Sequence, residues 1–370
     1  MSSHSTNEGT SSVRTHVVMI TNVYFPVIGG ISTFVKDLKI GLENKGVSVD
    51  LAVFPASLGR LPAPIRKASY VWFMARVLAK ACYMKLRGVS PVIVSHSASF
   101  CLMSAVFATR VLKCKSMHIF HSPITSKSWY LTRFSPYLDA VAYVSNATRK
   151  LYQGHGVPVH TNEFIVPGGI DISQFPEPDF EKKHQEKVIR ILFVGRVCEE
   201  KGVREVMQAV KIVKHEVHLD IVGNTQNSQQ DAYLEDLEKE LENSLLLKRR
   251  VRFHGALSGA PLIEEYRAAS LFVCPSIWEE PAPMVIAEAQ ASGLPVLAFN
   301  TGGLSERIND GIDGWLVPKG DVKALATAIE RLVQNPDEIF SAGRRARAKA
   351  EKEFDRSLMA VKVLNIVDSI

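Results

Sequence analysis

The chain has 370 residues, of which 46% are hydrophobic and 22% charged. This length can bury two full hydrophobic cores, and the composition is that of an ordinary globular protein rather than a fibrous or disordered one. The most apolar stretch, 92–112, is interrupted by His96 and Arg110, so no membrane-spanning helix is expected. Five scattered cysteines without metal-ligand spacing fit a reducing compartment, so a cytoplasmic protein is predicted.

The net charge of +6 is unevenly distributed along the chain. Residues 1–180 contain 18 Lys and Arg against 9 Asp and Glu, a balance of +9, whereas residues 181–370 contain 26 against 29, a balance of −3. The first half is therefore expected to face something anionic, such as a membrane, a phosphorylated acceptor or nucleic acid. Nucleic acid is the poorest of these, because no binding motif accompanies the charge, and no nucleic-acid partner is expected.

Short apolar runs alternate with helical patterns from residue 14 to 175, after a polar tail, 1–13, that is predicted to be disordered and lacks the apolar run of a signal peptide. A helix is predicted at about 31–44. Strands are predicted at 14–20, 49–54, 91–94, 116–120 and 140–144. Strands that alternate with helices indicate a parallel sheet covered on both faces.

The same alternation restarts after a polar, Pro-rich break, for which we predict a linker at 176–187. The second domain is predicted at 188–345, followed by a C-terminal helix, 346–370, that could pack back on the first domain. Its strands are predicted at 188–194, 217–222, 251–253, 271–274 and 295–298. The fold class is thus α/β, with two doubly wound, Rossmann-like domains facing a central cleft. Such sheets bind ligands at the carboxyl ends of their strands.

Two loops at these carboxyl ends contain candidate phosphate-binding residues. Gly29 and Gly30 precede the first helix, where glycine allows close approach of a ligand, although a Gly pair can also be a plain turn. Arg196 and Lys201 lie in the loop after the first strand of the second domain and could meet a diphosphate, or simply pair with Glu199 and Glu200 as surface charges. A Gly-x-Gly-x-x-Gly fingerprint is missing from the sequence, which argues against a dinucleotide oxidoreductase.

The segment 278–298 predicts a short helix that begins beside Glu280 and ends at Gly293. Glu288 would lie one turn further in. The free N–H groups of the helix terminus suit a phosphate, and Glu288 could accept two hydrogen bonds from a vicinal diol such as a ribose. The alternatives are a solvated helix face for Glu288 and a favourable helix-dipole charge for Glu280.

His121 directly follows a predicted strand and stands at the cleft edge. There it could donate to a hydroxyl or move a proton, or it could be a packed, hydrogen-bonded core histidine.

The segment 60–87 is basic and rich in aromatic residues. Arg76 and Lys80 are four residues apart and should share a helix face near Trp72. Such a helix can lie on an anionic membrane, which would favour a lipid-linked acceptor, or it can be an ordinary surface helix packed on the sheet.

In this order the motifs resemble those of the retaining glycosyltransferases of family 4, which have the GT-B fold; the resemblance covers nearly everything from residue 14 onward. The segments that carry it are 26–30, 166–171, Gly195-Arg196 with Lys201-Gly202, the pair Glu280 and Glu288 with seven residues between them, 301–303 with Glu306, and 313–317.

The resemblance implies a nucleotide-sugar donor, UDP- or GDP-linked, whose ribose is held by Glu288 and whose diphosphate is neutralised by Arg196 and Lys201. Glu280 would lie near the donor sugar and His121 would contact it, so these two are the candidate catalytic residues. Gly30 would approach the diphosphate from the other domain.

The backbone N–H groups of Ala282, Met284 and Val285 would face the donor, because Pro283 has none. No cofactor or metal is expected, since protein cations would replace a metal ion and the sequence has no Asp-x-Asp motif.

The implied activity is transfer to a glycan or lipid-linked acceptor, as in synthesis of cell-surface polysaccharide, lipopolysaccharide or glycolipid, by a cytoplasmic enzyme that could be peripheral to the membrane. Two other functions stay open. One is a GT-B-type epimerase or phosphorylase, and the other is a nucleotide-sugar-binding protein whose catalysis is impaired.

Overall fold

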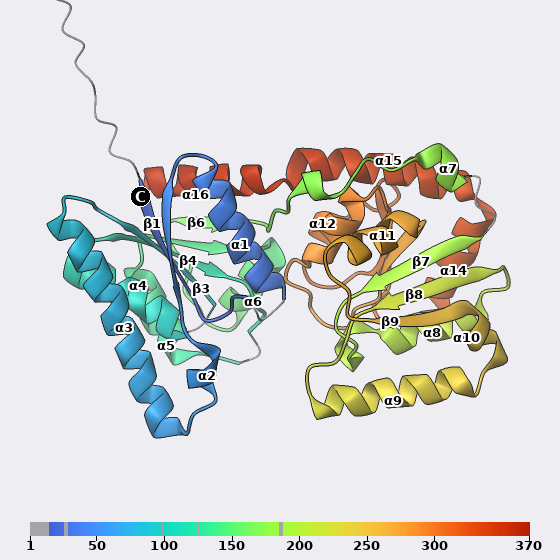
Figure 1. The fold of residues 1–370 in the computed structure, drawn as a ribbon, viewed down its shortest axis with the longest axis horizontal. Helices are drawn as coiled ribbons and strands as arrows, with labels where there is room; N and C mark the ends of the chain where they lie inside the picture. Colours follow the sequence, from blue (N-terminus) through green and yellow to red (C-terminus); the bar gives the residue numbers. More distant parts are fainter. Residues whose placement is uncertain (1–14, 26–28, 98, 125, 185–187) are drawn as a thin grey trace, which may run out of the picture.

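The computed structural model describes residues 15–25, 29–97, 99–124, 126–184 and 188–370. Within these residues the chain forms two α/β halves that lie side by side, each around a parallel six-stranded sheet (Figure 1). The predicted α/β class with two doubly wound domains is therefore confirmed. The predicted disordered tail, 1–13, lies outside the described residues.

The first sheet contains β1 (His16–Thr21), β2 (Ser48–Val53), β3 (Val92–His96), β4 (Lys115–Phe120), β5 (Ala140–Tyr143) and β6 (Glu163–Ile165). Its strand order is β2-β1-β3-β4-β5-β6, and all neighbouring strands are parallel. The order reverses between β1 and β3, which is where a doubly wound sheet opens a crevice at the carboxyl ends of its strands.

Helices cover both faces of this sheet. They are α1 (Gly30–Glu43), α2 (Ala56–Gly59), α3 (Ala63–Leu86), α4 (Ser99–Leu112), α5 (Trp129–Phe134) and α6 (Asn146–Gly154), with a 3-10 turn at Ser135–Tyr137. Val17 and Met19 of β1 pack in the core beneath α1, whereas Val18 and Ile20 pack on the other face with α3 and α4. The strand is apolar at consecutive positions because both of its faces are covered.

The second sheet contains β7 (Ile189–Val194), β8 (Val217–Val222), β9 (Val251–Gly255), β10 (Leu271–Cys274), β11 (Val296–Phe299) and β12 (Gly314–Val317). Its order is β12-β11-β10-β7-β8-β9, again parallel throughout. The helices of this half are α8 (Val203–Ile212), α9 (Ser228–Glu242), α10 (Leu245–Arg250), α11 (Ala260–Ala268), α12 (Met284–Ala291), α13 (Leu304–Arg307), α14 (Val322–Gln334) and α15 (Pro336–Glu353), with a 3-10 turn at Glu199–Lys201. Core clusters lie on both faces of the sheet.

All ten predicted strands are present, with ends shifted by at most two residues. Two strands were not predicted. β6 is only three residues long, and β12 begins with a glycine, so neither has the apolar run that marks a strand in a sequence. Both lie at sheet edges, where pairing to one neighbour is enough to define them.

The chain connects the two halves twice, and the two connections are bonded to each other. The first passes through residues 166–171 toward a 3-10 turn at Ile172–Gln174 and α7 (Phe180–His184), so the predicted linker contains a short helix. The second returns from α15 into α16 (Arg356–Ser369). The Ile170 N–H donates to the Phe354 carbonyl at 2.8 Å, and the Arg356 N–H donates to the Ile170 carbonyl at 2.8 Å.

The predicted C-terminal helix at 346–370 is two helices. The predicted start at 346 falls inside α15, and the break comes at Phe354 and Asp355. The Asp355 side chain accepts from the Ser357 N–H at 2.7 Å and so caps a new helix instead of continuing the old one. α16 runs back over the first half, where Met359, Ala360 and Val363 are buried in its core (Figure 1).

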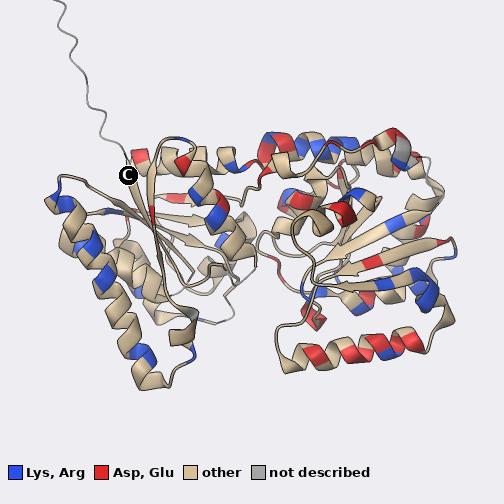
Figure 2. Ribbon diagram, viewed as in Figure 1, with Lys and Arg blue, Asp and Glu red and all other residues tan. Residues whose placement is uncertain are grey.

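The excess of cations in the first half and of acids in the second is concentrated on two helices, α3 and α9 (Figure 2). α3 contains five Lys and Arg and no Asp or Glu, whereas α9 is rich in acidic residues. Among the described helices, none is both long and apolar enough to cross a bilayer.

Gly41 of α1 allows α16 to pack closely, because a Cβ there would lie 2.9 Å from both the Ala360 Cβ and the Arg356 carbonyl oxygen. We expect Gly41→Ala to lower the free energy of unfolding by about 1–3 kcal/mol through overpacking. The control is Gly154→Ala, at an open helical position, where a change within about 0.5 kcal/mol is expected. Urea unfolding of both variants is the measurement, and equal effects at the two sites would contradict this packing.

Candidate functional site

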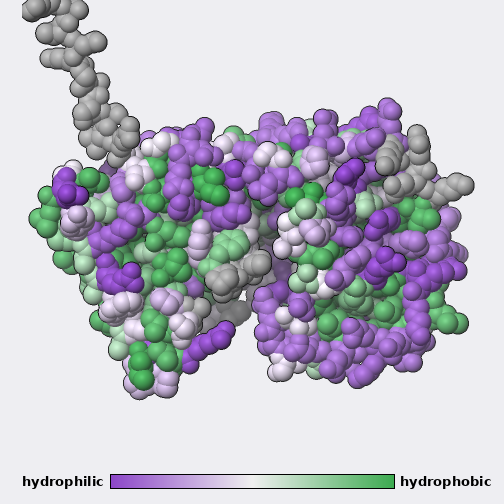
Figure 3. All heavy atoms as spheres, viewed as in Figure 1, coloured by the Kyte–Doolittle hydropathy of each residue, from purple (hydrophilic) through white to green (hydrophobic). Residues whose placement is uncertain are grey.

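The candidate site lies between the halves, where the carboxyl ends of both sheets meet. The surface is hollowed between the two halves (Figure 3). The start of α6, after β5, touches α13, after β11: the Glu306 carboxylate accepts from the Asn146 N–H at 2.8 Å and from the Ala147 N–H at 2.7 Å. Glu306 thus binds the N-terminus of α6, an interdomain contact that the sequence did not reveal.

Glu280 and Lys201 form a buried ion pair. The Glu280 side chain is 4% exposed, and its Oε1 lies 2.5 Å from the Lys201 Nζ. The same oxygen accepts from the Ser276 hydroxyl at 2.7 Å. The sequence placed both residues near the donor but did not predict that they contact each other, because they are 79 positions apart in the chain.

The loop that contains Glu280 has tight neighbours. The Gly303 N–H donates to the Glu280 carbonyl at 2.6 Å. At Gly302, where φ is +50°, a Cβ would lie 2.3 Å from the same oxygen. A side chain could not be accommodated there, so glycine at 302 allows the segment 301–303 to approach the loop that contains Glu280.

Arg196 is the more available cation of the pair that was predicted to meet a diphosphate. Its side chain is 41% exposed and lies 3.9 Å from Glu200, a weak contact at the surface. Lys201, by contrast, already neutralises Glu280. A diphosphate would therefore find a weakly paired guanidinium and a shared ammonium at this loop.

The predicted start of the helix near Glu280 is wrong: α12 begins at Met284. Pro283 has φ −64° and ψ 126°, an extended conformation, and a residue before proline, such as Glu280 or Ala282, is also biased away from the helix. Glu280 therefore belongs to the preceding loop.

The N-terminus of α12 nevertheless offers free donors. Among the described residues, no acceptor is bonded to the backbone N–H of Ala282, Met284 or Val285. These groups, together with the dipole of the eight-residue helix, can bind an anion.

Glu288 lies one turn inside α12 and is partly buried. Its Oε2 accepts from the Tyr266 hydroxyl at 2.8 Å. Burial raises the pKa of Glu288, and the hydrogen bond from Tyr266 opposes the rise. The tyrosine occupies one carboxylate oxygen, which leaves the other for a ligand.

On the opposite side of the cleft, Gly29 caps α1 and Gly30 is its first residue. The Gly29 N–H already donates to the Ser32 hydroxyl at 2.9 Å. Both glycines are exposed, and a Cβ at either would meet nothing within 4 Å. Of the two, only Gly30 retains a backbone N–H for a ligand.

His121 is buried next to a second histidine that the sequence did not single out. Its Nε2 lies 2.9 Å from the Nδ1 of His96, the last residue of β3, and its ring stands edge-on to Phe34. Burial lowers the pKa of His121 to about 3, so this ring is neutral near pH 7. A neutral His121 is suited to hydrogen bonding rather than to carrying a positive charge.

Three buried polar atoms near this pair have no hydrogen-bond partner among the described residues: Asn22 Oδ1, His96 Nε2 and Ser97 Oγ. Each residue ends or follows a strand of the first sheet at its carboxyl edge. Ser97 also has a positive φ of 63°. Unsatisfied buried polar atoms at a cleft edge indicate a place where hydroxyl groups of a ligand or water bind.

His254 of β9 belongs to a polar network. Asp220, His254 and Glu265 present ligand atoms within 4.8 Å of one another, as metal ligands would. Arg190, however, lies 2.8 Å from Asp220 and 3.4 Å from Glu265. The guanidinium therefore supplies the positive charge in this cluster.

The buried ion pair leads to a stability prediction. Lys201→Met leaves the Glu280 carboxylate buried and unpaired, which should lower the free energy of unfolding by about 3–5 kcal/mol. The double variant Lys201→Met, Glu280→Gln should recover roughly 1 kcal/mol or more of that loss, because no unpaired charge remains. Urea unfolding of Lys201→Met, Glu280→Gln and the double variant completes a double-mutant cycle. Additive losses of unfolding free energy would show that the two residues are not coupled.

Two family models together match most of the chain. Glycosyltransferase Family 4 matches residues 28–174, and Glycosyl transferases group 1 matches residues 174–353. The chain is 25% identical over 376 residues to phosphatidyl-myo-inositol mannosyltransferase of Mycobacterium leprae, covering 95% of this chain and 96% of that protein. It is 27% identical over 279 residues to the amylovoran biosynthesis glycosyltransferase AmsK of Erwinia amylovora, covering 70% of this chain and 65% of the other.

The fold has matches among solved structures as well. HepE of Anabaena, solved in complex with UDP, superimposes with a TM-score of 0.77 at 20% identity. The match covers 96% of this chain and 100% of HepE. Sequence families and fold agree in both halves. The chain belongs to the group 1 glycosyltransferases, its first half matches the family 4 model, and its fold is GT-B.

Proposed function

We propose that this glycosyltransferase takes a sugar from a UDP- or GDP-sugar and transfers it, with retention of configuration, to a glycan or lipid-linked acceptor. The observation that carries the proposal is Glu288, held by Tyr266 one turn inside a helix whose terminal N–H groups are free. A ribose and a diphosphate joined to it match this arrangement of acceptor and donors. HepE has also been solved with UDP-glucose, which supports the UDP form of the donor.

The donor would lie across the cleft. Its diphosphate would meet the N-terminus of α12, the exposed Arg196 and the Lys201 ammonium, while Gly30 approaches from the other half. The free oxygen of Glu288 would accept from the ribose hydroxyls. The cations would stabilise charge that develops on the leaving diphosphate, the role that a metal ion has in other sites, and we therefore propose that no metal is needed.

Glu280 is proposed to act through charge and position rather than as a nucleophile. Its carboxylate is already engaged by Lys201 and Ser276, which holds the ammonium beside the diphosphate site. In the proposed step the bond from the anomeric carbon to the diphosphate oxygen breaks, and the bond to the acceptor oxygen forms on the same face. The acceptor proton passes to the leaving phosphate oxygen. Neutral His121 would hydrogen-bond a sugar hydroxyl.

A lipid-linked acceptor is supported by the outward face of α3. Ile65, Trp72, Tyr83 and Leu86 are exposed along this helix at helical spacing. Arg76 lies over the Trp72 ring at 4.8 Å. Lys80 lies four residues from Arg76 on the same helix, as predicted, but its ammonium pairs with Asp50 of β2 at 2.6 Å.

A helix with exposed apolar side chains, several cations and no acid fits an anionic lipid surface. Two relatives are consistent with such an acceptor by name: the mannosyltransferase above and alpha-monoglucosyldiacylglycerol synthase of Streptococcus pneumoniae. We propose that α3 places the protein at the membrane surface and that the charge asymmetry of the chain serves this contact.

The ribose role predicts both an affinity and a pH dependence. Glu288→Ala should weaken binding of the preferred nucleoside diphosphate by about ten- to hundredfold, the value of a hydrogen bond to a charged group. Because the pKa of Glu288 is raised, its carboxylate is lost at a higher pH than for an ordinary Glu. Affinity of the wild type should therefore fall on acidification sooner than affinity of Glu288→Gln.

Calorimetric titration with UDP, GDP and ADP between pH 5 and 8, with the exposed Glu238→Gln as control, measures both effects. Release of nucleoside diphosphate from the donor in EDTA then tests catalysis without a metal. Binding without release would favour an impaired binding protein, and no nucleoside diphosphate binding at all would overturn the proposal.

The membrane proposal is tested by flotation with vesicles. Replacing Trp72 by Ser and Arg76 by Gln should lower binding to vesicles rich in phosphatidylglycerol by about fivefold or more, since one cation near the surface is worth about 1 kcal/mol. Leu245→Ser, an exposed apolar residue of the other half, is the control. Equal binding to neutral phosphatidylcholine vesicles, or no loss in the double variant, would contradict a role for this face.

A further inference from the structure

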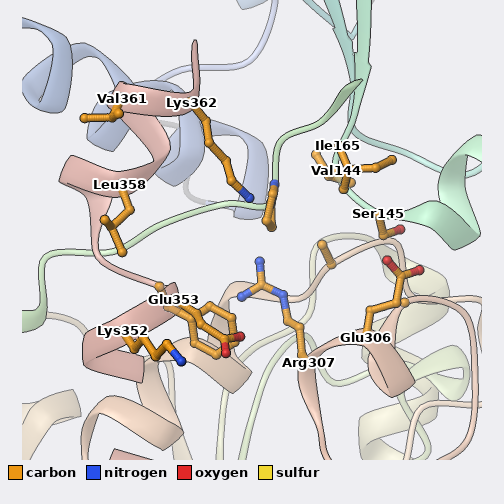
Figure 4. A pocket seen from close by; sticks show the side chains of 14 residues that line it. Val144, Ser145, Ile165, Glu306, Arg307, Lys352, Glu353, Leu358, Val361 and Lys362 are labelled. Carbon is orange, nitrogen blue, oxygen red and sulfur yellow. The ribbon is translucent and has the colours of Figure 1, made fainter. Parts of the chain in front are cut away.

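A cavity of about 420 Å³ lies between the halves, beside the two chain connections, and borders the proposed donor site at Ala282. Residues of both halves line it: Val144, Ser145, Ile165 and Pro167 from the first, and Ala282, Gly303, Glu306 and Arg307 from the second. The break between α15 and α16 forms another wall. Figure 4 shows the Arg307 side chain in the middle of this cavity.

Arg307 is a buried cation whose hydrogen bonds are incomplete. The residue is 3% exposed. Its Nη2 donates to the Gly168 carbonyl at 3.0 Å, and its guanidinium lies 4.9 Å from the centre of the Phe354 ring. Its Nε and Nη1 are buried and have no partner among the described residues. Burying such donors without an acceptor costs free energy, so an acceptor is expected from outside the chain.

The charge of Arg307 is likewise unbalanced. Burial lowers its pKa only to about 10, so it remains cationic near neutral pH. Glu306, its neighbour, is engaged by the N-terminus of α6. Glu353 also lines the cavity, but among the described residues no carboxylate lies within ion-pair distance of the guanidinium.

A second cation, on α16, lies near the same cavity. Lys362 of α16 lines the cavity, and its ammonium is directed toward the Arg307 guanidinium (Figure 4). Lys352 stands at the rim. Two like charges that converge on one space repel each other unless an anion lies between them. The surrounding walls, Val144, Ile165, Leu358 and Val361, are apolar.

We propose that this cavity is a binding site for an organic anion, a carboxylate or a phosphate monoester on a short apolar group, held by Arg307 and Lys362. The guanidinium would donate charge-assisted hydrogen bonds to the oxyanion from its unpartnered nitrogens. The apolar group would lie against the aliphatic walls. Because Arg307 belongs to the second half and α16 packs on the first, the bound anion would contact both halves. This proposal does not rest on the proposed donor site.

The test uses hexanoate, hexyl phosphate and inorganic phosphate as probes, with 1-hexanol as the uncharged control. We expect hexanoate or hexyl phosphate at saturation to raise the Tm of the full chain by about 2 °C or more, and hexanol to have no effect. Calorimetric titration then gives the Kd. Equal effects of inorganic phosphate and hexyl phosphate would identify a free phosphate as the ligand, and a preference for the hexyl compounds would identify the apolar form.

Variants assign the effect to this cavity. Arg307→Met should weaken binding at least tenfold. Arg307→Met also removes the hydrogen bond to the Gly168 carbonyl, so a second variant is needed. Lys362→Met changes an exposed residue and should weaken binding about threefold or more. Lys323→Met, an exposed lysine on α14, should change nothing.

Two results would overturn the proposal. One is the absence of any charged-probe effect on the wild type. The other is an effect that persists in Arg307→Met and Lys362→Met but is lost in Arg196→Ala, which would place the anion at the candidate diphosphate site instead. Binding of nucleoside diphosphate is measured separately, so failure of the donor proposal leaves this outcome readable.

Discussion

The arrangement of the molecule depends on the point where its two chain connections meet. Ile170 of the outgoing connection exchanges backbone hydrogen bonds with Phe354 and Arg356 of the returning one. Arg356 adds ion pairs of 3.5 Å to Asp37 and 2.9 Å to Asp171. α16 continues from this point into the core of the first half, so these contacts hold the returning connection against the outgoing one and the first half. The cleft, the contact of Glu306 with α6 and the Arg307 cavity all follow from it.

Charge within the cleft is balanced in two different ways. Around Glu280 the chain neutralises itself, since Lys201 and Ser276 satisfy a buried carboxylate. Arg196 has only a weak contact with Glu200, and among the described residues the first N–H groups of α12 and two nitrogens of Arg307 have no acceptor. Leaving a cation or an N–H group unpaired lowers stability and prepares a place for an anion. The distribution of these incomplete sites therefore separates the residues that support the fold from those available to ligands.

The first half has the corresponding polar edge. His96 and His121 contact each other beneath Phe34, and burial keeps the pKa of both below the usual range. Neutral rings can present either a donor or an acceptor, depending on the tautomer. Together with Asn22 and Ser97 they form a polar edge suited to hydroxyl groups at the carboxyl ends of β1, β3 and β4.

The sequence by itself determined the class of the fold and the loops in which to search. Apolar runs of strand length and the glycines and prolines between them are local signals, and they placed ten of the twelve strands and the loops that contain Arg196, Lys201, Glu280 and His121. Tertiary structure alone decided which charges meet. Lys201 pairs with Glu280, Lys80 with Asp50, and Tyr266 holds Glu288, whereas Arg307 is buried with no carboxylate at ion-pair distance among the described residues. These partners are distant in the chain, and only the packing of sheets and helices brings them together, because side-chain electrostatics acts through distances in space that no local periodicity encodes.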